Sequence, residues 1–403
     1  MSEIQLSASL LLQSCHDTSR DDAITIRTHF EPVAGFGAPI KPAIYEGGKY
    51  QEGSRWLDAE DKQATPIIVI DNEASQANRL EAALSHYRTE LGLPHFVLDF
   101  GSLALPPHLP KSLSSMQFPH RNADAYLRDA LLEGTPFQET DIGKAVFDAT
   151  ADRPEALLQW VPTGLLYGFW QSHLGKKGSQ AKLARCWTSQ LIGISPASTE
   201  ITTNGTKGDP YNLSIANQVV FDANEVTGWS VSDDLKKGKA KGDTPAGEKL
   251  TKERLSEIGH GQVPFDTQSP AAVSFKQIIQ TATVSFAALR RITCTNTDQS
   301  AHARAVLASL GIAAHTAAFG RAVSLRSGCD LRATSTKWSW LSPTGDQTIT
   351  TPTFETALAV FQETVGAAEK EGLNVGSKWR SETLLTPNEA LAKVVTLTWP
   401  EGN

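Results

Sequence analysis

The sequence predicts an α+β fold in which helices pack on a largely antiparallel sheet. Residues 67–70 are a β-branched run that ends at Asp71 and Asn72, two residue types that favour the start of a helix. After them, apolar side chains recur every three or four positions, at Leu80, Leu84, Tyr87 and Leu91. Residues 334–340 instead alternate between Thr or Trp and smaller polar or charged residues, which is typical of a half-buried strand.

Three segments near the C-terminus extend this prediction. The spacing of Phe354, Leu358, Phe361 and Val365 predicts a second amphipathic helix. Between the strand and this helix, residues 342–345 read Ser-Pro-Thr-Gly, the pattern of a type I turn. In the last segment, apolar and polar positions alternate, and we expect a closing strand that includes Lys393, Val395, Leu397 and Trp399.

Composition indicates an ordinary globular protein, since 40% of the 403 residues are hydrophobic and 20% are charged. No apolar run approaches the roughly 20 residues of a membrane helix, and Glu3 lies where a signal peptide would carry basic residues. The four cysteines lie far apart, which favours reduced, buried thiols over a zinc ribbon or disulfides. We therefore expect a cytoplasmic protein without a membrane partner.

Two stretches look like insertions into one domain spanning residues 1–403. Residues 31–63 are irregular and rich in Gly and Pro. Residues 233–254 hold seven Lys and Arg broken by glycines, so they cannot bury enough apolar area to pack and should form an exposed, flexible segment.

The distribution of charge along the chain is uneven. The net charge is −7, but residues 1–160 hold 13 Lys and Arg against 23 Asp and Glu, whereas residues 261–340 hold 8 against 3. A polyanion requires only a local positive surface, because phosphate contacts act within about 10 Å at physiological salt. Nucleic-acid binding is therefore compatible with the sequence, although ordinary variation along a chain explains the asymmetry as well.

The segments that come nearest to common catalytic motifs lack residues that those motifs require. A phosphate-binding loop ending at Gly175-Lys176 would need Gly at position 170 and Ser or Thr at position 177, where the sequence has Trp170 and Lys177. The chain also lacks a G-x-S-x-G elbow, an H-E-x-x-H helix and a G-x-G-x-x-G turn. We accordingly expect no catalytic residues, no cofactor and no metal.

Several polar segments are candidate phosphate sites. Residues 175–178 read Gly-Lys-Lys-Gly ahead of a helix expected to begin near Ser179, with Lys182 and Arg185 on one face of it. The loop around Lys207 is similar, and Arg290 and Arg291 end an apolar stretch. A solvated turn, a surface loop and a favourable helix C-terminus explain these segments equally well.

One block is more specific. Residues 69–81 read Val-Ile-Asp-Asn-Glu-Ala-Ser-Gln-Ala-Asn-Arg-Leu-Glu and resemble the I-D-S-x-x-S-Q-A-N-R-L-E signature of the backbone subunit of type I-G CRISPR effector complexes, a member of the RAMP superfamily. Asn72 stands where that signature has Ser. In a later block of the resemblance, Gly328 stands where the family has a basic residue. The similarity extends over most of residues 20–335, and its further blocks are 47–50, 55–56, 162–168, 181–185, 284–291 and 325–331.

The resemblance implies an RRM-like (ferredoxin-like) palm with inserted finger-like and thumb-like elements, residues 233–254 being the better thumb candidate. Such subunits stack head to tail into a helical filament along the guide RNA (crRNA), beside other subunits of the Cascade complex. The guide bases pair with target DNA in antiviral defence, and a separate enzyme cuts it. The resemblance thus implies a non-catalytic RNA-binding subunit.

We expect the RNA to be held by its sugar-phosphate backbone, because the aromatic signature of base-stacking RRM domains is absent from the sequence. Arg79 could instead pair with an acidic neighbour such as Glu73 or Glu81. Two other functions remain open: an RNA-guided endoribonuclease of the type III kind, and a protein scaffold without RNA. The expected RNA-binding residues are Gln76, Asn78, Arg79, Lys176, Lys177, Lys182, Arg185, Lys207, Arg290, Arg291 and Arg326.

Overall fold

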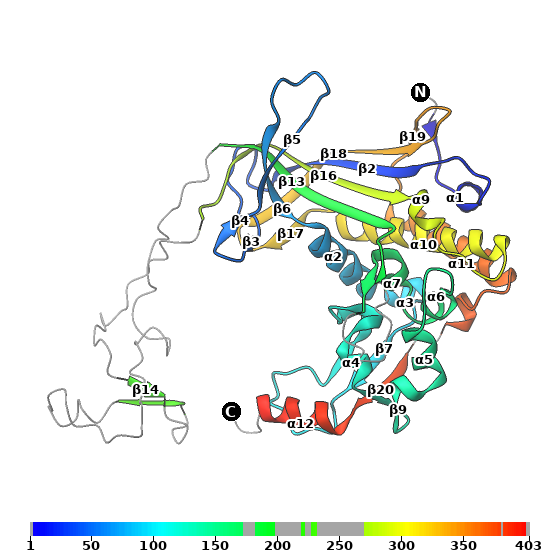
Figure 1. The fold of residues 1–403 in the computed structure, drawn as a ribbon. Helices are drawn as coiled ribbons and strands as arrows, with labels where there is room; N and C mark the ends of the chain where they lie inside the picture. The colour runs from blue at the N-terminus through cyan, green and yellow to red at the C-terminus, as the bar shows by residue number, and fades with distance from the viewer. Residues whose placement is uncertain are drawn as a thin grey trace. The chain divides into compact units, whose positions relative to one another are not determined.

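The computed structural model describes residues 3–171, 182–197, 219–221, 227–231, 270–379 and 382–399, and the chain divides into two compact units (Figure 1). The larger unit holds residues 1–43, 50–198 and 272–402, and the smaller one holds residues 44–49 and 199–271. The flexible segment expected at residues 233–254 lies outside the described residues.

A nine-stranded sheet forms the centre of the larger unit. β1 runs parallel to β19, and the neighbours from β19 through to β5 are antiparallel. Its order is β1 (Glu3–Ile4), β19 (Gln347–Ile349), β18 (Cys329–Leu341), β2 (Ala23–Pro32), β16 (Phe275–Ser285), β13 (Trp187–Pro196), β6 (Thr65–Asp71) and β5 (Glu52–Arg55), with β17 (Val323–Arg326) beside β18.

Helices cover one face of this sheet (Figure 1). α10 (Thr297–Phe319) contacts α1 (Ala8–Cys15), α2 (Glu73–His86) and α11 (Phe354–Lys370). Small residues such as Ala and Ser fill much of α10, and it is buried nearly all round, as expected of a helix enclosed by others. The mixed α+β class predicted from the sequence is confirmed.

A second, five-stranded sheet belongs to the same unit. Its order is β10 (Thr135–Pro136), β9 (Ala130–Leu132), β20 (Thr383–Pro387), β7 (Phe96–Asp99) and β8 (Ser112–Ser114). The short helices of this unit are α3 (Arg88–Leu91), α4 (Ala125–Arg128), α5 (Asp141–Phe147), α6 (Glu155–Trp160), α7 (Pro162–Tyr167), α9 (Phe286–Leu289) and α12 (Glu389–Thr398). The remaining strands form three pairs, β11 (Phe169–Trp170) with β12 (Lys182–Leu183), β14 (Val219–Phe221) with β15 (Trp229–Val231), and β3 (Ile44–Tyr45) with β4 (Lys49–Tyr50).

The predicted elements around α2, α11 and β18 are confirmed, except that the helix predicted to continue through Tyr87 and Leu91 is interrupted at Tyr87, and Leu91 lies in α3. β6 contains the β-branched run, and the Asn72 side chain caps α2 by accepting a hydrogen bond of 2.9 Å from the Ser75 backbone N–H. Leu80, Leu84 and Leu91 are buried. In the predicted turn, the Gly345 N–H donates to the Ser342 carbonyl at 2.9 Å.

The closing strand predicted over residues 393–399 is wrong, because this segment lies in α12. Pro387 ends β20, and the Asn388 side chain accepts a hydrogen bond of 2.8 Å from the Leu391 N–H, which starts a helix. Leu391 and Val395, one helical turn apart, pack against the core. This contact and the cap outweigh the strand preference of the β-branched residues.

The helix expected to continue through Lys182 and Arg185 is also wrong in its described part. Lys182 and Leu183 form β12 and pair with Trp170 and Phe169 of β11. Leu183 is buried while Lys182 is exposed, the alternation of inward and outward side chains that a strand produces. Residues 182 and 183 therefore form a two-stranded ribbon with β11 rather than a helix.

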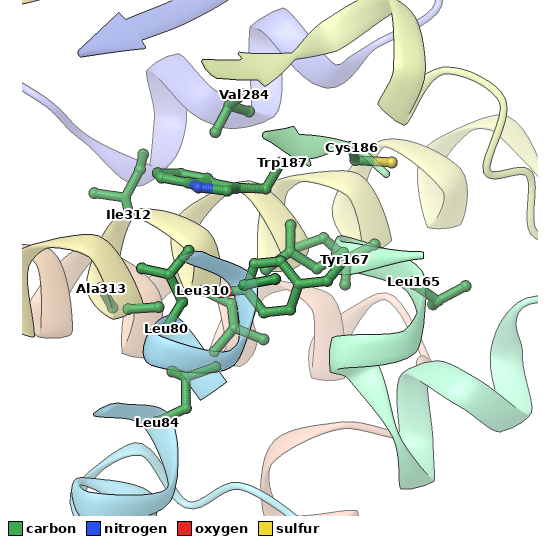
Figure 2. Packing of buried hydrophobic residues seen from close by; sticks show 14 of the residues in the cluster. Leu80, Leu84, Leu165, Tyr167, Cys186, Trp187, Val284, Leu310, Ile312 and Ala313 are labelled. Carbon is green, nitrogen blue, oxygen red and sulfur yellow. The ribbon is translucent and has the colours of Figure 1, made fainter. Parts of the chain in front are cut away.

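Trp187 of β13 occupies the centre of the core, between Val284 of β16 and the α10 helix (Figure 2). Its ring packs directly on the α10 backbone at Gly311, where an added Cβ would lie 2.5 Å from Trp187 Cε3. Leu80 and Leu84 of α2 extend this core on the side away from the sheet (Figure 2). The close approach of sheet and helix therefore depends on a glycine.

We predict that Gly311→Ala lowers the free energy of unfolding by about 1–3 kcal/mol, because the enclosed Trp187 ring has to move. Denaturant unfolding followed by near-UV circular dichroism measures the change. Gly366→Ala in α11 is the matched control, since nothing lies within 4 Å of its added Cβ. The control should be stabilised by up to about 1 kcal/mol through helix propensity. Equal effects of the two substitutions would contradict the packing argument.

Candidate nucleic-acid interface

The carboxylate of Asp71, the last residue of β6, is fully buried and accepts five hydrogen bonds. Ser75 Oγ donates at 2.7 Å and Gln76 Nε2 at 2.6 Å. Arg79 Nε donates at 2.7 Å and Arg79 Nη2 at 3.1 Å, and Arg326 Nη2 donates at 3.0 Å. We call these five residues the Asp71 network.

Gln76 connects this network to the sheet. Its side-chain oxygen accepts hydrogen bonds from Ser189 Oγ of β13 at 3.2 Å and from Gln280 Nε2 of β16 at 2.7 Å. The side chain is fully buried, and both ends of its amide are used by protein groups. Gln76, expected from the sequence to contact RNA, therefore fixes α2 on the sheet in this structure.

The two arginines of the network extend it toward β17. Arg79 Nη2 donates to the Leu325 carbonyl at 3.0 Å, and Arg326 Nη1 donates to the Ile70 carbonyl at 3.0 Å. About a quarter of each arginine side chain remains exposed. The acidic partner of Arg79 is Asp71, rather than the Glu73 or Glu81 considered from the sequence. Two guanidinium groups facing one carboxylate leave an excess positive charge at the surface.

Burial tends to raise the pKa of the Asp71 carboxyl, but the hydrogen bonds and charge of Arg79, aided by Ser75 and Gln76, outweigh it and lower the pKa. Asp71 is therefore ionised whenever the chain is folded near neutral pH. An ionised carboxylate is the form that can hold two arginines.

A groove with a volume of about 940 Å³ lies between α2 and the β11–β12 ribbon. It brings together Asn78, Lys182 and Arg185, three of the residues expected to bind RNA. We call it the α2–ribbon groove. Its lining residues are Glu73, Ala74, Asn78, Pro119, His120, Arg121, Tyr167, Gly168, Phe169, Trp170, Lys182, Leu183, Ala184, Arg185 and Thr188.

The cations of the groove are held in different ways. Arg185 Nη1 lies 3.2 Å from Glu73 Oε2 in an ion pair that is partly exposed, and such pairs contribute at most about 1 kcal/mol. Lys182 Nζ lies 5.9 Å from the centre of the Trp170 ring. Neither contact would prevent these side chains from turning toward a phosphate.

Arg121 also lines the groove, and no sequence motif predicts it there. Its Nε and Nη2 donate to the Glu81 carboxylate at 2.7 and 2.8 Å, and its Nη1 donates to the Gly168 carbonyl at 2.9 Å. Burial raises the pKa of Glu81, against the opposing effect of Arg121. This nearly buried pair connects α2 to the ribbon and so shapes the groove.

Gly168 is required at the start of the ribbon. Its φ is +74°, and an added Cβ would lie 2.5 Å from the Leu183 carbonyl oxygen. The β12 strand can therefore approach α7 only because residue 168 is glycine.

Among the described residues that were expected to bind RNA, Arg290 and Arg291 do not line the groove. Arg290 Nη2 donates to the Asp21 carbonyl at 3.0 Å, and Arg291 Nε donates to the Ala288 carbonyl at 3.3 Å, both just after α9. Lys176, Lys177 and Lys207 lie outside the described residues. Residues 176 and 177 fall in the connection between β11 and β12, the two strands that border the groove.

Within the part of the chain that the structure describes, no group of three or more His, Cys, Asp or Glu residues could hold a metal ion. The thiols of Cys15, Cys186 and Cys329 are buried, and burial raises the pKa of Cys15 and Cys186 to about 12. Among the described helices, none is long and apolar enough to cross a bilayer.

We predict that Asp71→Asn lowers the free energy of unfolding at pH 7 by about 3–5 kcal/mol, because it leaves two partly buried arginines without their counter-charge. Because the carboxyl pKa is lower in the folded chain than its unfolded value of about 3.9, this stabilisation is present above that pH and is lost as the pH falls through the folded value. The difference between wild type and variant should therefore shrink below about pH 4.

Urea unfolding at pH 7 and pH 3 measures both effects. Asp346→Asn is the control, since Asp346 is exposed in the turn after β18. We expect its effect to stay within about 0.5 kcal/mol at both pH values. A stability loss in Asp71→Asn that does not change with pH would contradict the role of the ionised carboxylate.

Residues 24–196 match the model of a protein family described as CRISPR-associated protein GSU0053. The match covers less than half of the chain and includes β2, β6, α2, the β11–β12 ribbon and β13. The blocks at 284–291 and 325–331 lie beyond it. No curated protein matches the chain. Over residues 24–196, the sequence is therefore similar to a family of CRISPR-associated proteins.

Proposed function

We propose that this chain is a non-catalytic backbone subunit that binds guide RNA in a CRISPR surveillance complex of the type I-G Cascade kind. One observation carries the proposal: every residue that lines the α2–ribbon groove lies within the segment that matches a CRISPR-associated family. The groove exposes basic side chains along its border, as a phosphate-binding surface requires.

The strand order supports a ferredoxin-like palm as part of this proposal. In the sheet, four strands lie in the order β18, β2, β16 and β13, which is 4-1-3-2 when they are numbered along the chain, with α2 before β13 and α10 before β18. This is the β-α-β-β-α-β arrangement, to which β6 and β5 add two strands at one side. Residues 233–254 are the proposed thumb.

In this proposal the RNA follows the groove along α2. Lys182 and Arg185 contact phosphates, Asn78 donates a neutral hydrogen bond, and the excess charge of Arg79 and Arg326 attracts the strand from one side. The Asp71 network holds α2 in position and therefore the border of the groove. Copies of the chain arranged head to tail would extend such a path along one guide, which then pairs with target DNA.

We predict that replacing Lys182 and Arg185 together by Ala weakens the binding of single-stranded RNA. If each contacts one phosphate, the slope of log K against log salt should become less steep by about 1.4, since each contact in a single strand contributes about 0.7. The loss should be the same for guides of unrelated sequence. Fluorescence anisotropy of labelled RNA at several salt concentrations measures both quantities.

The matched control replaces Lys111 and Lys144 by Ala, two exposed lysines outside the groove. It should leave the slope unchanged. An unchanged slope in the groove variant would contradict the RNA path.

Incubating the assembled complex with complementary RNA and Mg²⁺ tests the non-catalytic part of the proposal, because cleavage at regular intervals would instead indicate an endoribonuclease.

A further inference from the structure

Trp170 is an exposed aromatic residue at the border of the α2–ribbon groove. Its side chain is 60% exposed, whereas its neighbour Phe169 points inward and is 7% exposed. The register of the ribbon places Trp170 directly opposite Lys182, which brings the ammonium group over the ring. β11 therefore buries one aromatic ring and presents the other to solvent.

Basic side chains lie near Trp170. Lys182 and Arg185 line the same groove, where Arg185 forms a partly exposed ion pair with Glu73. An isolated exposed aromatic residue is common on protein surfaces. A flat indole among cations in a groove is a more specific combination, because it suits a ligand that has both negative charges and planar rings.

We propose that Trp170 is a stacking platform for a base of single-stranded RNA, beside the phosphates held by Lys182 and Arg185. This inference rests on the proposed function and adds a contact to a base, where the sequence had led us to expect contacts to the backbone alone. Every base has a π-face, so stacking on Trp170 binds without discriminating between sequences. It therefore strengthens binding to any guide.

The position of Trp170 also explains how a stacked base and a bound phosphate can belong to the same nucleotide. Trp170 and Lys182 are cross-strand partners, and Arg185 follows on the same chain three residues after Lys182. A nucleotide has its phosphate and base within a few ångströms of each other, which matches a cation and a ring on paired positions. Gly168, which permits the ribbon to form against α7, fixes the place of the indole.

The experiment combines a substitution in the protein with a change in the ligand. Wild-type full-length chain, Trp170→Ala and Trp170→Phe are titrated with a single-stranded RNA and with an abasic strand of equal length. Stacking predicts that Trp170→Ala binds the base-bearing strand about 5- to 100-fold more weakly, with an unchanged salt slope. It predicts no effect of the substitution on the abasic strand, and Trp170→Phe should retain most of the affinity.

Trp56→Ala is the matched control, since Trp56 is 64% exposed between β5 and β6 and does not line the groove. It should bind both strands as the wild type does, and equal unfolding midpoints establish that each variant is folded. Equal losses on both strands, or no loss on either, would overturn the stacking role while leaving RNA binding in place. If the wild type binds neither strand, the proposed function itself fails.

Discussion

The carboxylate of Asp71 lies where β6 ends and α2 begins, and it has no exposed surface. An ionised group in such a place would cost several kcal/mol if it were left without partners. It is instead satisfied by donors from α2 and from β17, and through Gln76 it is connected to β13 and β16. The position of α2 against the sheet therefore depends on one buried charge.

The α2–ribbon groove follows from that position. The border formed by α2 carries Asn78 and Glu73, and the Arg121–Glu81 pair connects the same helix to Gly168 at the start of the ribbon. The Asp71 network holds α2 on the sheet, and the Arg121–Glu81 pair connects α2 to the ribbon. The side chains that we propose to contact RNA lie outside these two interactions, and of them Arg185 forms only the partly exposed pair with Glu73.

The block at residues 69–81 has two effects in the structure: it fixes α2 on the sheet, and it contributes positive charge at the surface. Residues 69–81 lie in the segment that matches a family of CRISPR-associated proteins, and in the structure their polar side chains mainly hold the protein together. Their excess positive charge still reaches the surface through Arg79 and its neighbour Arg326. In our proposal, the block builds the RNA-binding surface without each of its residues touching RNA.

The sequence by itself determined the elements that local physics controls. A β-branched run, a capping Asn and an apolar stripe produced β6 and α2, because strand preference, the cap and helical periodicity agree there. At the C-terminus they disagree: alternation in residues 393–399 favours a strand, but the Asn388 cap and the packing of Leu391 and Val395 produce a helix. Only the tertiary structure decided that conflict.

Tertiary structure also decided the partners of the charges. Arg79 had acidic neighbours in sequence at Glu73 and Glu81, yet Arg185 pairs with Glu73, Arg121 pairs with Glu81, and Arg79 pairs with Asp71. The partner of Arg121 is 40 residues away and that of Arg185 is 112 residues away. Ion pairing depends on distance in space, which folding sets by packing apolar surfaces, so residue types and spacing alone could not assign these pairs.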